Sequence, residues 1–163
     1  MSKPDRPLRK KGEYLQARTF FITSPTWGRR SLFRAERMAR LFLDVLAAYR
    51  AQGRYLLHDF VLMPNHFHAL ISVPPGMTVE RAVQFIKGGF SYRAKKELGF
   101  HGEVWQRGFA DEYVPNVAEY ESRRAYIRLN PVRAGLAKAP EEYPYGSAGS
   151  GTQTDPAPTH LRG

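Results

Sequence analysis

Two histidines separated by a single residue, His66 and His68, are the side chains in this sequence best placed to do chemistry together. They lie within residues 55–73, an apolar stretch rich in branched and aromatic residues, which is typical of β-strands. Side chains of a strand alternate between its two faces, so both imidazoles point the same way, about 7 Å apart along the strand. Such a pair can bind one metal ion. The spacing alone also fits a zinc site or two structural histidines.

A tyrosine and an asparagine, Tyr126 and Asn130, form a second pair at chemically useful spacing. Residues 118–129 have the pattern of a helix that ends at Asn130, because a proline follows and disfavours a helical predecessor. Residues four apart lie on one helix face, so the phenol and the amide can face a common partner. If that partner is the histidine pair, a divalent metal held by the histidines and Asn130 would polarise a phosphodiester, and Tyr126 would attack the phosphorus. A free tyrosine, with a pKa of about 10, needs such help.

Three other side chains are alternatives with weaker geometry. Tyr113 falls in a strand-like segment, and Tyr120 precedes Tyr126 by six residues, which places it on a different helix face. Asp59 is a further candidate acid or ligand, but it lies on the other arm of the predicted hairpin from His66. A surface or turn-pairing role fits Asp59 equally well. Tyr126 is therefore the preferred nucleophile.

The elements that must position these residues follow a recognisable order. Residues 55–63 and 66–73 form a predicted hairpin joined by Pro64-Asn65, a tight-turn pair. Around it we expect a strand at 18–24, helices at 35–52 and 79–98, and strand-like segments at 105–109 and 111–114. This split βαβ order predicts an α+β fold, an antiparallel sheet with helices packed on one face. The histidine face would lie opposite these helices or beneath a late helix.

The chain carries a large positive charge and no cysteine. Its 163 residues include 25 Lys and Arg against 15 Asp and Glu, a formal net charge of +10. Such an excess favours a polyanionic partner such as nucleic acid. Without cysteine, disulfides and thiolate metal sites are excluded, and a metal must use nitrogen and oxygen ligands. No stretch is apolar over the roughly 20 residues that span a bilayer, so we expect a cytoplasmic protein without a membrane partner.

Composition divides the chain into three parts. Residues 1–13 are basic and contain prolines, which predicts a flexible arm and no secretory signal. Residues 14–146 hold the predicted helices and strands and are expected to form one domain. Residues 147–163 are rich in Gly, Ser, Thr and Pro, so we expect a disordered tail.

Four segments of the chain resemble the single-tyrosine HUH transposases, and most closely the REP-associated tyrosine transposases. These segments are VLMPNHFHALI (61–71), FIKGGFSYRAKK (85–96), VWQRGFADEYV (104–114) and AYIRLNPVRAGLAKAPEEYPYGSA (125–148). The resemblance implies a ferredoxin-like antiparallel sheet of the HUH endonuclease type. His66 and His68 match the family's metal ligands. Tyr126 matches its nucleophile, and Asn130 matches its third ligand position.

The resemblance also implies an activity. The cofactor would be Mg²⁺ or Mn²⁺, and cleavage of single-stranded DNA would leave a 5′-phosphotyrosine link and a free 3′-OH. The DNA would lie beside a hairpin such as a REP element, and the transposase would act at the nucleoid as a monomer or a homodimer. Two alternatives stay open. One is a domesticated DNA-binding protein that no longer transposes, and the other is a metal-dependent nuclease that uses water.

Candidate DNA contacts combine basic side chains with an aromatic surface on which bases can stack. The loop at 26–30 offers both, through Trp27, Arg29 and Arg30. Basic residues further along the chain are also predicted to contact DNA, namely Lys87, Arg93, Arg107 and Arg123. Arg123 is one helical turn before Tyr126, so its charge would also stabilise the phosphate under attack.

Overall fold

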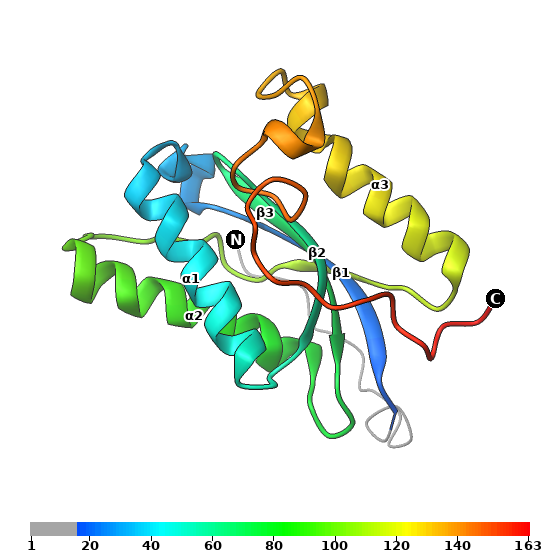
Figure 1. Cartoon of the computed structure of the whole chain (residues 1–163). Helices are drawn as coiled ribbons and strands as arrows, with labels where there is room; N and C mark the ends of the chain where they lie inside the picture. The colour runs from blue at the N-terminus through cyan, green and yellow to red at the C-terminus, as the bar shows by residue number, and fades with distance from the viewer. Residues whose placement is uncertain (1–15) are drawn as a thin grey trace.

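A four-stranded antiparallel sheet forms the centre of the molecule (Figure 1). The computed structural model describes residues 16–163, and the predicted basic arm at residues 1–13 lies outside them. The strands are β1 (Arg18–Pro25), β2 (Leu56–Met63), β3 (His66–Val73) and β4 (Ala110–Tyr113), in the spatial order β2-β3-β1-β4. Every neighbouring pair is antiparallel. The predicted ferredoxin-like α+β fold is therefore confirmed.

Helices lie on both faces of this sheet (Figure 1). Helices α1 (Glu36–Ala51) and α2 (Val79–Leu98) pack on one face, whereas α3 (Val117–Arg133) covers the other. Short 3₁₀ turns are present at η2 (Trp27–Arg29), η3 (Leu32–Arg34) and η4 (Pro140–Glu142). The expected packing on one face thus holds for the first two helices, and the late helix covers the opposite face. None of the helices within residues 16–163 is long and apolar enough to cross a membrane.

Alternation along β3 decides which face carries the histidines. Phe67 belongs to the larger apolar cluster, beneath α1 and α2. Leu70 belongs to the smaller cluster, beneath α3. His66 and His68 share the face of Leu70, because side chains two residues apart on a strand point the same way. Both histidines therefore lie beneath α3.

A β-bulge in β2 decides which residues of that strand face α3. The pairing with β3 shifts between Leu57 and Asp59, so that His58 is the extra residue. Leu57 therefore packs in the larger cluster beneath α1 and α2. Asp59, two residues later, points to the other face and meets α3.

Helix α3 continues through Asn130-Pro131, where the sequence predicted its end. Proline lacks a backbone N–H donor, but N–H groups that follow Pro131 in the chain still close the last turn of the helix. The N–H groups of Ala134 and Leu136 donate to the carbonyls of Asn130 and Pro131. Asn130 therefore stays on the helix, one turn after Tyr126.

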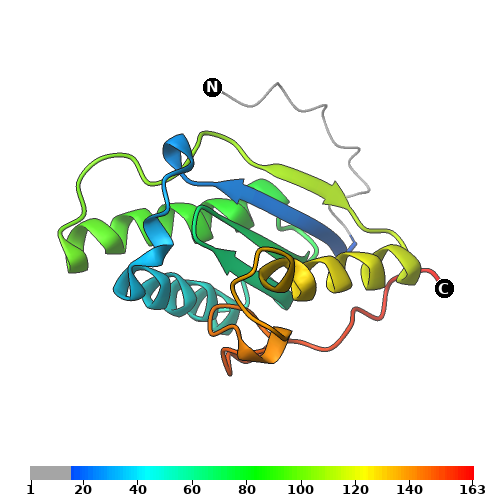
Figure 2. The same ribbon diagram turned by 90° about the horizontal axis from the view of Figure 1, so that it is seen from above.

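The C-terminal segment, residues 147–163, differs from the disorder expected from its composition. It follows the outer edge of β2, where Ser147 and Asp155 each donate a backbone N–H to a strand carbonyl. The Asp155 carboxylate also pairs with Arg50 of α1, with an N–O distance of 2.7 Å. The last residues reach the start of α3, where Arg162 bridges to Asn116 (Figure 2). Polar contacts to an edge strand thus order a segment that has few apolar side chains.

Candidate active site

The two histidines of β3 lie side by side on the sheet face beneath α3. Their ring centroids are 4.8 Å apart, with an interplanar angle of 78°. His68 is buried, and His66 is half-buried at the start of the strand. The two imidazoles are thus close enough to share one metal ion.

Hydrogen bonds at Nδ1 determine how each imidazole is presented. The side-chain oxygen of Asn65 accepts a hydrogen bond from His66 Nδ1 at 2.7 Å. The hydroxyl of Thr23, on β1, lies 2.8 Å from His68 Nδ1. Both contacts engage Nδ1 and leave Nε2 as the nitrogen that can bind a metal. Outer hydrogen bonds of this kind orient metal-binding histidines.

Burial keeps both imidazoles in the neutral form that metal binding requires. It lowers the pKa of His68 to about 3, and the charges of His66 and Arg123 act in the same direction. Burial also lowers the pKa of His66, helped by the charge of Arg29. Two neutral nitrogen donors are therefore present at neutral pH.

Tyr126 of α3 is the tyrosine that meets the histidine pair. Its ring lies edge-on to His68, with centroids 5.3 Å apart. It is also edge-on to Phe21 at 6.0 Å, and Phe21 stacks on His68 at 5.2 Å, so the three rings form one cluster. Tyr126 remains 40% exposed, so a phosphodiester can reach it from solvent.

The other two candidate tyrosines lie elsewhere. Tyr113 packs on Phe20, which belongs to the cluster beneath α1 and α2. Tyr120 is buried and lies edge-on to His58, with ring centroids 5.8 Å apart. The tertiary structure therefore brings Tyr126, and neither of these two, to the histidine pair.

Asn130 follows Tyr126 by one turn on the same side of α3. The helix runs roughly antiparallel to β3, so the step from Tyr126 to Asn130 leads toward the end of the sheet where His66 lies (Figures 1 and 2). Within residues 16–163, no three His, Cys, Asp or Glu side chains are grouped to hold a metal. The half-buried side chain of Asn130 offers an amide oxygen as a further donor. Its role as a ligand stays a prediction.

Arg123 places a guanidinium beside the ring cluster. Its central carbon lies 5.0 Å from the centroid of the Phe21 ring. The side chain also forms an ion pair with Glu112 of β4. Glu112 pairs with Phe21 across the two strands and so shares the histidine face. Sequence reasoning missed Glu112, although the alternation of β4 was the signal that could have found it.

The loop at 26–30 adjoins the histidine pair. The backbone N–H of Thr26 donates to a carbonyl of the β2–β3 turn at 2.9 Å. Trp27 is 40% exposed, and Arg29 is close enough to lower the pKa of His66. Arg30 donates to two backbone carbonyls, so its guanidinium holds the loop together. The structure thus brings the charge of Arg29 close to His66 and leaves Trp27 exposed in the same loop.

Two of the remaining predicted DNA contacts, Lys87 and Arg93, are on α2, whereas the histidine pair lies on the sheet face beneath α3. Lys87 of α2 is on the opposite side of the sheet, and its ammonium donates to two carbonyls of the loop at 106–108. Arg93, also on α2, pairs with Glu97. Arg107 is exposed in the loop that Lys87 holds. DNA contact by these three side chains stays a prediction.

The fold and the site together define a class of protein: an α+β domain with a histidine pair on its sheet and a tyrosine on the helix above it. The family model described as "Transposase IS200 like" matches residues 18–130. The chain belongs to this transposase family.

Similar proteins agree with this assignment. A REP-associated tyrosine transposase of Escherichia coli (strain K12) is 23% identical over 133 residues, which are 81% of this chain and 77% of that protein. A REP-associated tyrosine transposase solved bound to a REP hairpin has a TM-score of 0.70 at 22% identity, covering 100% of this chain and 92% of its own. A protein of Deinococcus radiodurans R1 described as a transposase has a TM-score of 0.53 at 18% identity, covering 72% of this chain and 95% of its own. These matches confirm the predicted resemblance.

Proposed function

We propose that this transposase cleaves and rejoins single-stranded DNA beside hairpins through a metal-dependent reaction with a 5′-phosphotyrosine intermediate. The observation that carries the proposal is the approach of Tyr126 to His68, with ring centroids 5.3 Å apart. Covalent phosphoryl transfer needs a nucleophile that the substrate can reach and groups that activate the phosphate. The exposed phenol of Tyr126 would be the nucleophile. The neutral imidazoles of His66 and His68 would hold the cation that activates the phosphate.

The residues present fit a divalent cation, Mg²⁺ or Mn²⁺. His66 and His68 would bind it through Nε2, because hydrogen bonds engage their Nδ1 atoms. Asn130 would add an amide oxygen. This mixed set of ligands suits Mn²⁺ better than Mg²⁺, which prefers oxygen. When bound, the cation would act as a Lewis acid toward the scissile phosphate.

Tyr126 would supply the nucleophile. As its Oη forms a bond to phosphorus, the bond from phosphorus to the 3′ oxygen breaks. The phenol loses a proton and the departing 3′ oxygen gains one, so the products are a free 3′-OH and a 5′ end linked to Tyr126. Arg123, held beside Phe21, would stabilise the charge on the phosphate during attack. Attack of a 3′-OH on the phosphotyrosine reverses these steps and rejoins a strand.

The proposed substrate is single-stranded DNA with a hairpin. The net charge of +10 favours phosphate contacts, and the exposed Trp27 beside Arg29 offers a surface for a stacked base. A similar protein has been solved bound to a REP hairpin. Because α3 packs on the sheet of its own chain, we propose that a monomer suffices for cleavage. Its place of action would be the nucleoid in the cytoplasm.

A cleavage assay tests this proposal. Oligonucleotides from the DNA beside the reading frame, with a hairpin and single-stranded flanks, are labelled at the 3′ end and incubated with Mn²⁺, Mg²⁺ or EDTA. We expect a protein–DNA adduct that survives denaturation, that needs the cation, and that Tyr126→Phe abolishes. Cleavage that persists without an adduct would favour the nuclease that uses water. Hairpin binding without cleavage would favour the domesticated binding protein.

A further inference from the structure

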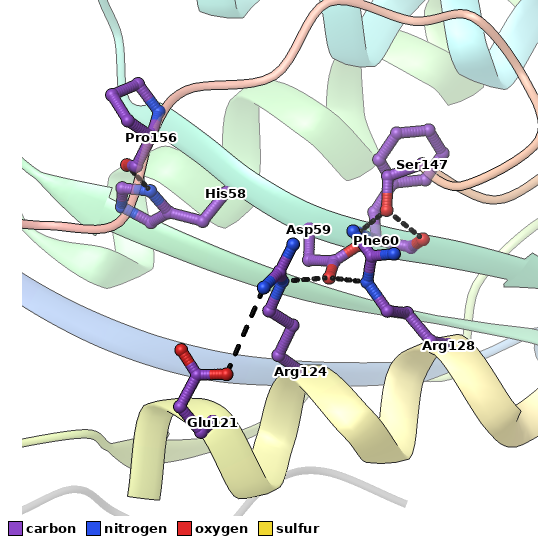
Figure 3. A network of polar contacts seen from close by, with 8 residues as sticks. All are labelled: His58, Asp59, Phe60, Glu121, Arg124, Arg128, Ser147 and Pro156. Atoms are coloured by element: carbon purple, nitrogen blue, oxygen red, sulfur yellow. Dashed lines mark hydrogen bonds and ion pairs between the residues drawn. The ribbon is translucent and has the colours of Figure 1, made fainter. Parts of the chain in front are cut away.

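Asp59 is a buried carboxylate to which the proposed reaction assigns no role. Its side chain has 0% exposure, and carboxylates are almost never fully buried unless paired. Figure 3 shows two arginines of α3 converging on it: Arg124 Nε lies 3.5 Å and Arg128 Nε 3.2 Å from Asp59 Oδ2. The other oxygen, Oδ1, accepts the backbone N–H of Phe60 at 3.2 Å. Both oxygens of the carboxylate are therefore engaged.

The spacing of the two arginines makes this contact specific for one position of α3. Positions 124 and 128 are one turn apart, so the Asp59 carboxylate meets two successive turns of the helix. A slide by one turn would move α3 by about 5.4 Å, and a shift by one residue would rotate it by about 100°. Either motion takes at least one guanidinium away from Asp59. One carboxylate therefore fixes both the axial position and the rotation of the helix.

Tyr126 lies between the two arginines in sequence and on the other side of the helix. Positions 124 and 126 differ by about 200° around the axis. Helix α3 therefore meets Asp59 of β2 on one side and presents Tyr126 to His68 on the other. The ion pairs act at the same helical turn as the nucleophile, where an error of about 1 Å in position can cost about 100-fold in rate.

Apolar packing holds α3 less firmly than it holds the other helices. Helix α3 buries three residues, whereas α1 and α2 bury six each. Apolar contacts are non-directional and permit small slides, unlike hydrogen-bonded ion pairs. Burial raises the pKa of the Asp59 carboxyl although both arginines oppose that shift, so the ionised group costs folding free energy. A buried ion pair is weak evidence for stability, so the geometry of this contact is what points to a role in positioning the helix.

We propose that Asp59 is a positioning residue, whose ion pairs with Arg124 and Arg128 dock α3 so that Tyr126 stays against His68. This inference rests on the proposed function, because it assigns Asp59 a task in presenting that nucleophile. We call the three charged side chains the Asp59 clamp.

The substitution Asp59→Asn tests the clamp with little change in shape. The amide oxygen still accepts the N–H of Phe60, but the charge that holds the arginines is removed. In single-turnover reactions with Mn²⁺ and saturating oligonucleotide, we expect the rate of adduct formation to fall at least about 10-fold. The dissociation constant for the oligonucleotide should stay within about twofold. A rate equal to that of the unmodified protein would overturn the proposal.

A matched control separates positioning from general loss of stability. Val83→Ala on α2 removes buried methyl groups from the opposite face of the sheet, where Val83 is 1% exposed. At a temperature where both variants are folded, we expect this control to keep the unmodified rate. If Val83→Ala slows the reaction as much as Asp59→Asn does, the effect is one of stability and the clamp is refuted.

The arginines provide a second test. If they act only through Asp59, the variant that combines Asp59→Asn, Arg124→Gln and Arg128→Gln should react within about twofold of the rate of Asp59→Asn alone. The interaction is already lost in the single variant. If the arginines instead contact DNA, Asp59→Asn would free them and tighten oligonucleotide binding. The two Gln substitutions would then weaken binding and reduce the dependence of the affinity on salt. That second pattern would contradict the clamp.

Hydrogen exchange tests the clamp without metal or DNA. Asp59→Asn should speed amide exchange in residues 117–133 while leaving α1 and α2 close to their unmodified rates. Unchanged exchange in α3 would overturn the proposal. If the unmodified protein forms no adduct, the proposed function fails, and hydrogen exchange still decides whether Asp59 docks α3.

Discussion

The hydroxyl of Thr23 lies 2.8 Å from Nδ1 of His68, directly across the pair of strands β1 and β3. An outer hydrogen bond of this kind fixes the tautomer and the ring orientation of a metal-binding histidine. The contact also joins the histidine pair to β1, the strand that carries Phe21 of the ring cluster. Thr23 is therefore expected to affect cation binding without touching the cation.

Thr23→Val removes this hydrogen bond and keeps the branched shape of the side chain. We expect the affinity for Mn²⁺ to fall by about 10-fold or more, as outer hydrogen bonds typically contribute. Titration calorimetry of the protein without DNA measures that affinity. Thr154→Val, in the C-terminal segment, is the matched control and should leave it unchanged. Equal affinities in the two variants would show that Thr23 does not orient a metal ligand.

Acidification is expected to destabilise the protein through its buried histidines. Burial lowers the pKa of His68 from 6.5 to about 3, so below pH 6.5 the unfolded chain binds a proton that the folded chain does not. Stability attributable to this one ring therefore falls by about 1.4 kcal/mol for each pH unit between these two values. Burial lowers the pKa of His66 and of His58 as well, so the slope of the whole protein should be steeper.

Denaturant unfolding in EDTA at pH 7, 6 and 5 measures that slope. The free energy of unfolding should fall less steeply with acidification in His68→Gln than in the unmodified protein. The difference between the two slopes should be up to about 1.4 kcal/mol per pH unit. If the two slopes are the same, His68 does not stay neutral in the folded protein.

Lys87 and Arg29 should respond differently to substitution, although both are predicted DNA contacts. Lys87 donates to two backbone carbonyls, so Lys87→Met should lower the free energy of unfolding by roughly 1–3 kcal/mol and leave the salt dependence of DNA binding unchanged. Arg29 is exposed beside the site, so Arg29→Gln should change stability by less than about 0.5 kcal/mol. It should reduce the slope of log affinity against log salt by about 0.7.

Fluorescence anisotropy with a labelled single strand, measured across a range of salt concentrations, separates these two cases. A smaller salt slope for Lys87→Met would identify its ammonium as a phosphate contact. An unchanged slope for Arg29→Gln would remove the loop at 26–30 from the DNA path.

Local rules made much of the site predictable from the sequence. Period-two alternation placed His66 and His68 on one face, and helical spacing placed Tyr126 and Asn130 on one side of α3. The meeting of Tyr126 with His68 joins residues far apart in the chain, and periodicity alone does not specify it. The family resemblance supplied that expectation, and the ring contact agrees with it.

Contacts that depend on tertiary detail were not predictable. For Asp59 the sequence left open a further acid or ligand role and a surface or turn-pairing role, because the element that covers each sheet face was unknown, and α3 covers it. Lys87 was predicted to contact DNA because of its charge, and the sequence did not show that its ammonium also donates to two loop carbonyls. Its contact with DNA stays a prediction. The C-terminal segment was expected to be disordered from its composition, yet Asp155 pairs with Arg50 and bonds to β2. For Asp59 and for the C-terminal segment, contacts with specific charged partners outweigh what the residue types alone suggest.

Covalent attachment of DNA to Tyr126 tests the central claim most directly. Trypsin cleaves after Arg124 and Arg128, so Tyr126 falls in the tetrapeptide AYIR, which holds no other tyrosine, while Tyr113 and Tyr120 share the peptide of residues 108–123. The adduct formed with Mn²⁺ is digested with nuclease and trypsin and analysed by mass spectrometry. The structure predicts a nucleotide joined through its 5′-phosphate to the AYIR peptide. A nucleotide on the 108–123 peptide, or strand cleavage with neither peptide modified, would contradict Tyr126 as the nucleophile.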